Sequence, residues 1–496
     1  MKSILSIFLI ITFLISCTQN QSLYKIDLTG TWQFQMDPND VGASEKWFNK
    51  TFSDTVQLPG SMVENGKGYD ITLETEWTGG VRNTEWYKHP SYKPYHDSTN
   101  IKFPYWLQPN KKYTGAAWYS KKVTIPKNWE GKTVWLNLER PHWETVVWVN
   151  GIEIGKQNSL ATPHRFDISN FLIIGENTIA VRIDNRTKEV DVGWNSHSIS
   201  DHTQSNWNGI VGEISIESKD AIYFEDVRIF PDILTKSVKV KAVVQNTKLK
   251  EQKIEIEAEA EHKKTEVETP EKFFDFTLAP GENIVTLTYP LGDDALLWDE
   301  FNPNVYELLL EMRYKNGEDV KRVDFGLREF KVEDGAIKIN GRQVFLRGTL
   351  ECAIFPKTGY PPTDVEGWKK VYAAIQAHGL NHIRFHSWCP PKAAFEAADE
   401  MGVYLHPECS SWANQSTRLG SGLPIDQYIW DESERIVKEY GNHPSFVMMA
   451  YGNEPGGPKH IDYLQKFVNY WKEKDNRRIY TAGAGWPVID ENEFHC

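Results

Sequence analysis

The feature that most constrains the fold is a change of hydrophobic rhythm at about residue 344. From there onward, short apolar runs alternate with segments of helical periodicity. The apolar runs are "VFLRGT", "LNHIRFH", "VYLHPE", "FVMMAYGNE" and "RIYTAGAG", and the helical segments lie near 364–377, 392–401, 426–440 and 460–472. This alternation is typical of parallel βα units. Five strands in a row predict an incomplete (β/α)8 (TIM) barrel of about five strands.

The first of these helical segments carries its own boundary signals. Asp364 stands directly before it and has the side chain of a good N-cap, while His378-Gly379 is typical of a helix end. We therefore expect a helix from about 364 to 377.

Two β-rich regions precede the barrel pattern. Residues 24–219 contain many short alternating runs, and Asn150-Gly151 lies between two of them, which is a strong hairpin signal. This pattern predicts a jelly-roll sandwich. Residues 221–333 alternate in the same way and predict an immunoglobulin-like β-sandwich. An aromatic-rich insertion at 77–113 is long enough to suggest a functional loop.

The N-terminus has the pattern of an export signal. Lys2 precedes an apolar run from Ile4 to Ile15, and Ser16-Cys17 follows. The sequence around Cys17 resembles a bacterial lipoprotein signal, in which this cysteine would be lipidated. We expect a protein exported to the bacterial cell envelope and held at a membrane by this lipid. The expected domains are then 1–17 (signal), 22–219 (jelly roll), 220–333 (immunoglobulin-like) and 334–496 (barrel).

Composition excludes some partners and favours others. The formal net charge is −13, and a nucleic-acid-binding surface needs clustered lysine and arginine, so we expect no nucleic-acid partner. The chain has 19 Trp, 21 Tyr and 23 Phe. Aromatic rings stack on sugar faces as well as in cores. The five cysteines lack the paired spacing of a zinc site, and no metal or organic cofactor is expected.

Polar residues follow each of the first four predicted barrel strands. They are Glu351 and Cys352, then Arg384, His386 and Trp388, then Glu408 and Trp412, then Asn453 and Glu454. The active site of such a barrel lies at the C-terminal ends of its strands. These residues are therefore the candidate site.

The order of the regions, together with several motifs, resembles glycoside hydrolase family 2. The motifs are "GAAWYSKKVTIP", "RPHWETVVWVNGIEIG", "SNWNGIVGEI", "GRQVFLRG", "NHIRFHSWCPP" and "GNEP". The resemblance extends from about residue 24 to the end of the chain. It implies a retaining enzyme that acts on a terminal sugar, such as a β-galactoside of an oligo- or polysaccharide.

The resemblance also implies roles for the candidate residues. Glu454 would be the general acid/base, which protonates the departing glycosidic oxygen and later deprotonates water. Asn453 would hydrogen-bond the sugar 2-hydroxyl, and Arg384 would hold the active-site carboxylates. The other substrate-binding candidates are His386, Trp388, Glu351, Glu408 and Trp412.

The sequence departs from the family pattern in three ways. His386 follows Arg384 by two positions instead of three, and "LHPECSSW" lacks the usual Asp-Glu ending. A retaining enzyme also needs a second carboxylate as nucleophile. The family places it after the seventh strand, for which residues 344–496 leave no room. We therefore expect impaired hydrolysis. The alternatives are a non-catalytic carbohydrate-binding lipoprotein and a fragment from an interrupted gene model.

Overall fold

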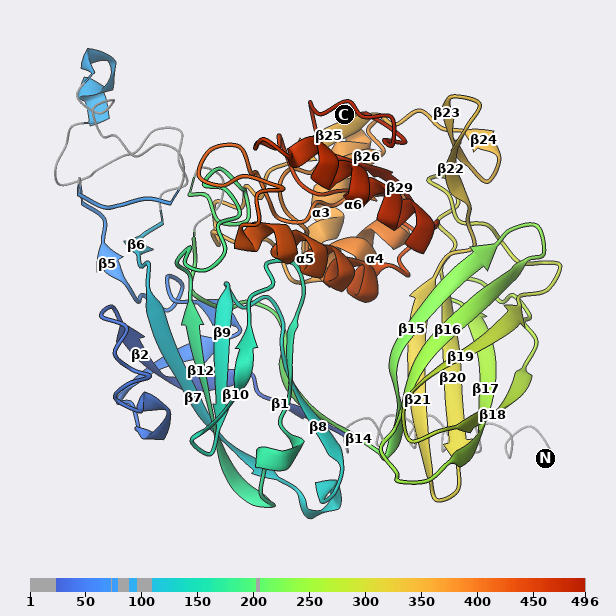
Figure 1. The fold of residues 1–496 in the computed structure, drawn as a ribbon, viewed down its shortest axis with the longest axis horizontal. Coiled ribbons are helices and arrows are strands. Elements are labelled where there is room, and N and C mark those ends of the chain that lie inside the picture. The colour runs from blue at the N-terminus through green and yellow to red at the C-terminus, as the bar shows by residue number, and fades with distance from the viewer. Residues whose placement is uncertain (1–23, 73, 79–88, 96–108, 202–205, 496) are drawn as a thin grey trace, which may run out of the picture.

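The computed structural model describes residues 24–72, 74–78, 89–95, 109–201 and 206–495. Figure 1 shows three units along the chain, and the third lies against loops at one end of the first. The expected signal peptide with Cys17 and much of the 77–113 insertion lie outside the described residues. Within the described ranges, no helix is both long and apolar enough to cross a membrane.

The first unit is an antiparallel sandwich of a four-stranded and a six-stranded sheet, ordered β1-β14-β8-β11 and β10-β9-β12-β7-β2-β3. Its strands are β1 (Lys25–Asp27), β2 (Gly30–Asp37), β3 (Asp54–Leu58), β7 (Ala116–Ile125), β8 (Thr133–Leu138), β9 (Glu144–Val149), β10 (Ile152–Gln157), β11 (His164–Asp167), β12 (Gly175–Asp184) and β14 (Ile214–Lys219). Short pairs join β4 (Gly60–Ser61) to β13 (Gly209–Ile210) and β5 (Tyr69–Asp70) to β6 (Lys111–Lys112). Short 3-10 helices lie at Trp47–Asn49, Pro90–Tyr95, Lys127–Trp129 and Ser169–Phe171.

Residue alternation produces this sandwich. In β8, Val134, Leu136 and Leu138 are buried in the shared core, whereas the residues between them are partly exposed. The hairpin predicted at Asn150-Gly151 is confirmed, because β9 and β10 flank it. Both turn residues have a positive φ, 52° and 80°, as a tight two-residue hairpin requires.

The second unit is a seven-stranded immunoglobulin-like sandwich, as expected. Its sheets are ordered β15-β16-β19 and β18-β17-β20-β21. The strands are β15 (Ile222–Asp232), β16 (Ser237–Asn246), β17 (Gln252–His262), β18 (Lys272–Leu278), β19 (Gly281–Pro290), β20 (Tyr306–Tyr314) and β21 (Gly317–Phe325). Its core is built almost entirely from apolar side chains of these strands.

The third unit begins with a small antiparallel sheet and continues as an incomplete (β/α)8 barrel. The small sheet joins β22 (Phe330–Glu333), β23 (Ala336–Ile339) and β24 (Arg342–Gln343). The parallel strands are β25 (Gly348–Glu351), β26 (His382–Phe385), β27 (Tyr404–His406), β28 (Met448–Ala450) and β29 (Ile479–Thr481). Helices α3 (Val365–Ala377), α4 (Lys392–Met401), α5 (Pro424–Tyr440) and α6 (His460–Lys474) alternate with them. Parallel bridges between Leu405 and Phe446 and between Glu408 and Ala450 link β27 to the β28 segment.

The boundaries in this unit follow local chemistry with one exception. Asp364 caps α3 by accepting a 2.7 Å hydrogen bond from Gly367 N, and the helix ends at Ala377 with His378 as its C-cap, as predicted. The first barrel strand was expected near 344–349 and lies instead at Gly348–Glu351. The reason is that Val344 packs with Phe330 in the cluster beneath the barrel.

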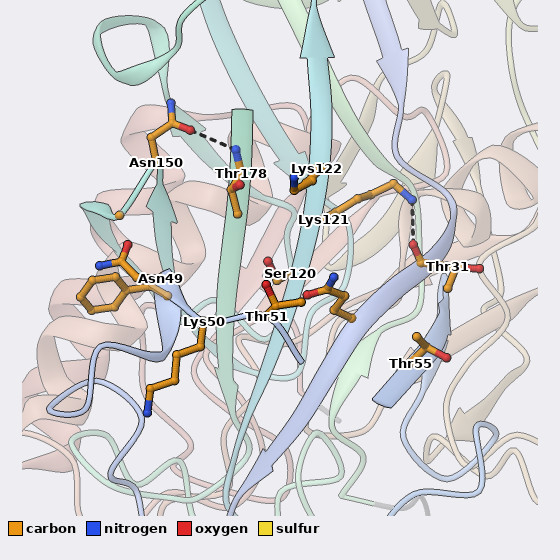
Figure 2. Close-up of a pocket in the computed structure, with 13 residues that line it drawn as sticks. Thr31, Asn49, Lys50, Thr51, Thr55, Ser120, Lys121, Lys122, Asn150 and Thr178 are labelled. Atoms are coloured by element: carbon orange, nitrogen blue, oxygen red, sulfur yellow. Dashed lines mark hydrogen bonds between the residues drawn. The ribbon is translucent and has the colours of Figure 1, made fainter. Parts of the chain in front are cut away.

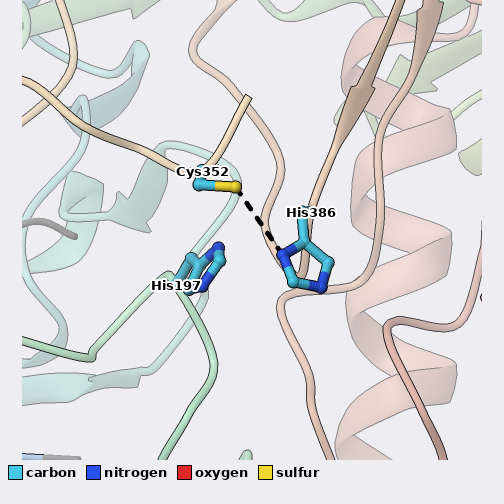
Figure 3. Close-up of side chains that lie close together, drawn as sticks. All are labelled: His197, Cys352 and His386. Atoms are coloured by element: carbon cyan, nitrogen blue, oxygen red, sulfur yellow. Dashed lines mark hydrogen bonds between the residues drawn. The ribbon is translucent and has the colours of Figure 1, made fainter. Parts of the chain in front are cut away.

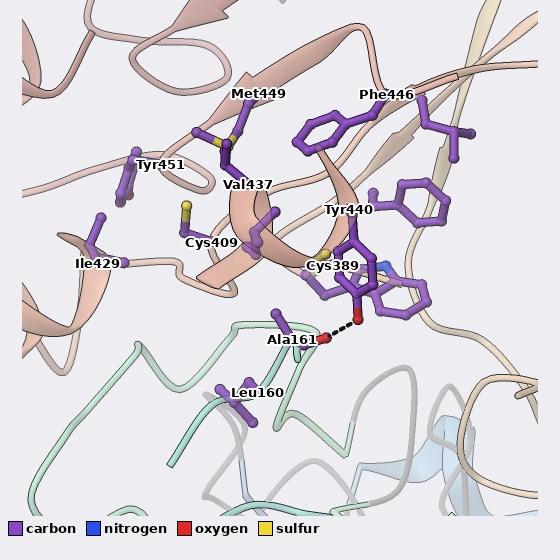
Figure 4. Packing of buried hydrophobic residues seen from close by; sticks show 14 of the residues in the cluster. Leu160, Ala161, Cys389, Cys409, Ile429, Val437, Tyr440, Phe446, Met449 and Tyr451 are labelled. Atoms are coloured by element: carbon purple, nitrogen blue, oxygen red, sulfur yellow. Dashed lines mark hydrogen bonds between the residues drawn. The ribbon is translucent and has the colours of Figure 1, made fainter. Parts of the chain in front are cut away.

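Loops of the first unit dock onto the barrel through buried polar contacts. Glu432 on α5 accepts hydrogen bonds from Leu160 N at 2.9 Å and Ala161 N at 2.8 Å. Tyr440 donates to Ala161 O, as Figure 4 shows. Gly193 lies so close to Trp412 that a Cβ there would be 1.9 Å from the Trp412 carbonyl oxygen. The docking therefore fixes a first-unit loop at the barrel mouth.

Candidate active site

Four loops at the C-terminal ends of the barrel strands share an unusual backbone conformation. Each holds one non-glycine residue with a positive φ: Ala353 (56°), Ser387 (57°), Ser410 (58°) and Glu454 (36°). Such conformations cost roughly 1–3 kcal/mol each and are concentrated at functional sites. All four follow consecutive strands, β25 to β28, so the strain lies at one end of the sheet.

Arg384 connects three of these strand ends. Its Nε donates to Glu408 Oε1 at 2.6 Å, and its Nη2 donates to Asn453 Oδ1 at 2.8 Å. Ser387 N donates to the other Glu408 oxygen at 2.6 Å. Burial raises the pKa of Glu408, and the charge of Arg384 opposes that change. The network holds the Asn453 side chain in one orientation.

Asn453 keeps unused hydrogen-bonding capacity. It is 2% exposed, and its amide nitrogen has no hydrogen bond of good geometry among the described residues, although its side chain also lies against His386. Buried polar groups in folded proteins are nearly always paired, so an unpaired donor needs an explanation. A hydroxyl group of a bound ligand would supply the missing acceptor.

Glu454 lies at the same mouth and is partly exposed. Its Oε2 accepts a hydrogen bond from Trp412 Nε1 at 3.0 Å and a longer one from Asn414 Nδ2 at 3.5 Å. Within the described part of the chain, Oε1 makes no hydrogen bond. One carboxylate oxygen is thus held in place while the other is available to exchange a proton with a ligand.

Glu351 and Trp388 occupy different surroundings. Glu351 Oε2 accepts from Ala353 N at 2.9 Å. Burial raises the pKa of Glu351 to about 7, while the backbone N–H groups of Ala353 and Ile354 oppose the change. Trp388 is 3% exposed, donates to Glu351 O at 3.0 Å and packs against Phe385. Its ring therefore belongs to the core behind the strand ends, where it offers no open face to a sugar.

His386 contacts His197, a residue that the sequence pattern did not indicate. Its ring lies 4.5 Å from that of His197, which belongs to the docked first-unit loop, and both rings contact Trp412. No local pattern around His197 ties it to the barrel. Asn414, two positions after Trp412, could have been selected as another polar strand-end residue.

The first unit has a hollow of its own, with a volume of about 440 Å³. It lies on the six-stranded sheet, on the face opposite the sandwich core, and Figure 2 shows the residues that line it. Its lining residues are Thr31, Gln33, Phe48, Asn49, Lys50, Thr51, Thr55, Ser120, Lys121, Lys122, Asn150, Gly151 and Thr178. This lining contains no carboxylate, and Phe48 already stacks on Trp148. The hollow therefore offers no carboxyl group for acid–base chemistry.

Comparison with known families gives matches along most of the chain. Residues 80–219 match the sugar binding domain of glycosyl hydrolases family 2, residues 222–328 match a second model described simply as glycosyl hydrolases family 2, and residues 330–486 match the TIM barrel domain of that family. A curated relative, a beta-galactosidase of Priestia megaterium, is 22% identical over 93% of this chain. The chain spans 44% of the length of that relative.

Solved structures share the fold. A glycosyl hydrolase family 2 member from Bacteroides cellulosilyticus matches with a TM-score of 0.71 and 19% identity, covering 94% of this chain and 57% of the other. A β-glucuronidase from Ruminococcus gnavus in complex with D-glucaro 1,5-lactone matches with a TM-score of 0.70 and 19% identity. That match covers 95% of this chain and 76% of the other.

Proposed function

Because the chain belongs to glycoside hydrolase family 2, we propose that its barrel mouth binds a terminal sugar, such as a β-galactoside, with Glu454 as the general acid/base of a retaining glycosidase. The observation that carries the proposal is the pairing of a fixed Asn453 with a half-free Glu454 at one strand end. Glu454 protonates the departing glycosidic oxygen, and its carboxylate then removes a proton from the attacking water.

Asn453 and Trp412 position the sugar and the Glu454 carboxyl group, respectively. The unpaired amide nitrogen of Asn453 donates to a sugar hydroxyl, and Arg384 prevents the amide from rotating away. Trp412 orients Glu454 through its indole N–H. A positioned carboxyl group of this kind contributes roughly 10²- to 10⁴-fold to a rate.

Neither of the two other carboxylates described at the strand ends is well suited to act as the nucleophile. Both oxygens of Glu408 already accept hydrogen bonds, and its side chain is fully buried. Burial raises the pKa of Glu351 to about 7, so a large fraction of it is protonated at neutral pH. We infer that the 496-residue chain by itself binds sugar and turns it over poorly.

The test uses sugar-shaped ligands and two variants. We expect D-galactono- and D-glucaro-lactones to be discriminated in calorimetric titrations with the 496-residue chain. Asn453→Ala is expected to weaken binding of the better ligand by roughly 10-fold or more, since leaving a buried hydrogen-bonding group of the ligand without its partner costs about 1–3 kcal/mol. Glu454→Gln should retain binding of the uncharged lactone, because the amide still accepts the Trp412 hydrogen bond.

The matched control is Asn283→Ala in the second unit, which should bind like the wild type. Turnover of 4-nitrophenyl β-galactoside and β-glucuronide by the wild type should remain at background. Hydrolysis abolished by Glu454→Gln would support the acid/base role and overturn the inference about the nucleophile. Equal lactone affinity of wild type and Asn453→Ala would overturn the proposed sugar site.

A non-catalytic sugar-binding role is the second candidate, and the hollow in Figure 2 favours it. Lys121 Nζ donates there to Thr31 O at 3.0 Å, and hydroxyl and amide groups surround the pair. Oligosaccharide binding that survives Asn453→Ala and is lost in Thr178→Val would favour this role.

We also propose that Cys17 carries a lipid that anchors the protein in the bacterial envelope. The support is the apolar run from Ile4 to Ile15 followed by Ser16-Cys17. Cys17→Ser is expected to move the expressed protein from the membrane fraction to the soluble fraction, as followed by immunoblotting. Cys389→Ser, which changes a cysteine in the barrel core, is the control. Membrane association that is equal in wild type and Cys17→Ser would contradict the anchor.

A further inference from the structure

Three potential metal ligands meet at the barrel mouth beside the proposed sugar site. Figure 3 shows His197, Cys352 and His386 facing a common centre. One ligand atom from each lies within 4.8 Å of the others. The ligands come from three separate segments: the docked loop of the first unit and the loops after β25 and β26.

The spacing agrees with a tetrahedral ion. Cys352 Sγ and His386 Nδ1 are 3.7 Å apart. With metal–sulfur bonds of about 2.3 Å and metal–nitrogen bonds of about 2.0–2.1 Å, a tetrahedral angle places S and N roughly 3.5 Å apart. An ion would therefore need only a small adjustment of this pair.

The surroundings hold the ligands in place. His197 N donates to Ser387 Oγ at 2.8 Å, and His386 N donates to Glu351 O at 3.0 Å. Both imidazole rings pack against Trp412, which restricts their rotation. Fixed backbone and ring orientations are what a preformed site requires.

The chemistry of the donors selects the kind of ion. A histidine ligates through a ring nitrogen of its neutral imidazole, and a cysteine ligates as a thiolate, so an ion bound here displaces the thiol proton. Thiolate with imidazole favours zinc-class ions over Mg²⁺ or Ca²⁺.

We propose that His197, Cys352 and His386 bind one Zn²⁺-class divalent cation, whose fourth ligand is water or a hydroxyl group of a sugar. The proposed cation site does not depend on whether the chain hydrolyses sugars, because it is tested by cation binding alone. It would be separated from Glu454 by a single side chain, since Trp412 contacts both imidazoles and donates to that carboxylate.

The experiment titrates the metal-free 496-residue protein with Co²⁺ and Zn²⁺. We expect one equivalent of Co²⁺ to produce the intense visible bands of a tetrahedral ion and a near-ultraviolet thiolate-to-cobalt band. Cys352→Ser should lose the thiolate band and bind at least 10-fold more weakly. His378→Ala, which changes an exposed histidine at the end of α3, should match the wild type.

A second measurement needs no variant. Zn²⁺ should slow alkylation of Cys352 by iodoacetamide, with the modified peptide identified by mass spectrometry. A wild-type protein that shows no thiolate–cobalt band, or an alkylation rate of Cys352 that Zn²⁺ leaves unchanged, would overturn the proposal.

Discussion

Replacing Arg384 by alanine is expected to lower the stability of the barrel unit by about 3–5 kcal/mol, which is the usual cost of removing one partner of a buried ion pair. Arg384 is 9% exposed and pairs with Glu408, which is fully buried. Without the guanidinium, the Glu408 carboxylate keeps only the hydrogen bond from Ser387 N. The same substitution frees Asn453, so lactone affinity should fall together with stability.

Urea unfolding followed by hydrogen–deuterium exchange measures this effect, because peptides from β26 to β28 report on the barrel separately from the two sandwiches. Arg384→Lys should fall between wild type and alanine, since lysine keeps the charge and loses the two-pronged geometry. The matched control is Arg322→Ala, an exposed arginine that pairs with Glu307, for which we expect a change of about 0–1 kcal/mol. The prediction would be contradicted if the barrel peptides of Arg384→Ala lost protection at the same urea concentration as those of the wild type.

Asp475→Asn is expected to cost a similar 3–5 kcal/mol at neutral pH. Asp475 follows α6 and accepts hydrogen bonds from Arg477 at 2.7 and 2.8 Å and from Arg478 at 2.5 Å. Burial alone would raise the pKa of Asp475, but the two guanidinium groups outweigh it and hold that pKa well below its usual value. Asparagine would leave both arginines buried without a counter-charge.

The pH dependence gives an internal check on Asp475. Because its pKa is lower in the folded than in the unfolded state, its contribution is complete above the unfolded value of about 3.9 and declines as the pH falls below it. The stability difference between wild type and Asp475→Asn should therefore be constant from pH 7 to about pH 5 and shrink below about pH 4. Asp70→Asn, which changes an exposed partner of Lys111, is the control and should cost less than about 1 kcal/mol. A difference that persists unchanged at pH 3 would contradict the assignment.

Local patterns were sufficient for most of the secondary structure. The helix expected at 392–401 is α4, and the helix expected at 364–377 is α3 with its Asp364 cap. The sequence pattern also selected residues that lie together, since Arg384, Glu408 and Asn453 form one hydrogen-bond network. The physical reason is that the C-terminal ends of parallel strands lie side by side, so polar residues placed there must meet.

Local patterns were insufficient where packing between distant segments decides. The first barrel strand begins at Gly348 because Val344 joins the cluster beneath the barrel. Trp388 was expected to bind substrate, yet its ring lies in the core because Phe355 and Trp368, from the preceding βα unit, pack against it. Neither outcome depends on the residues next to these positions in the sequence.

The sequence by itself determined the order of two sandwiches and a barrel and placed an Asn-Glu pair at the end of β28. Period-two and helical patterns, caps and turns are local properties and can be recognised one segment at a time. Only the tertiary structure decided that a loop of the first unit closes against the barrel mouth through Gly193 and brings His197 to Cys352 and His386. That contact depends on the shapes of two separately folded surfaces, and no local pattern encodes it.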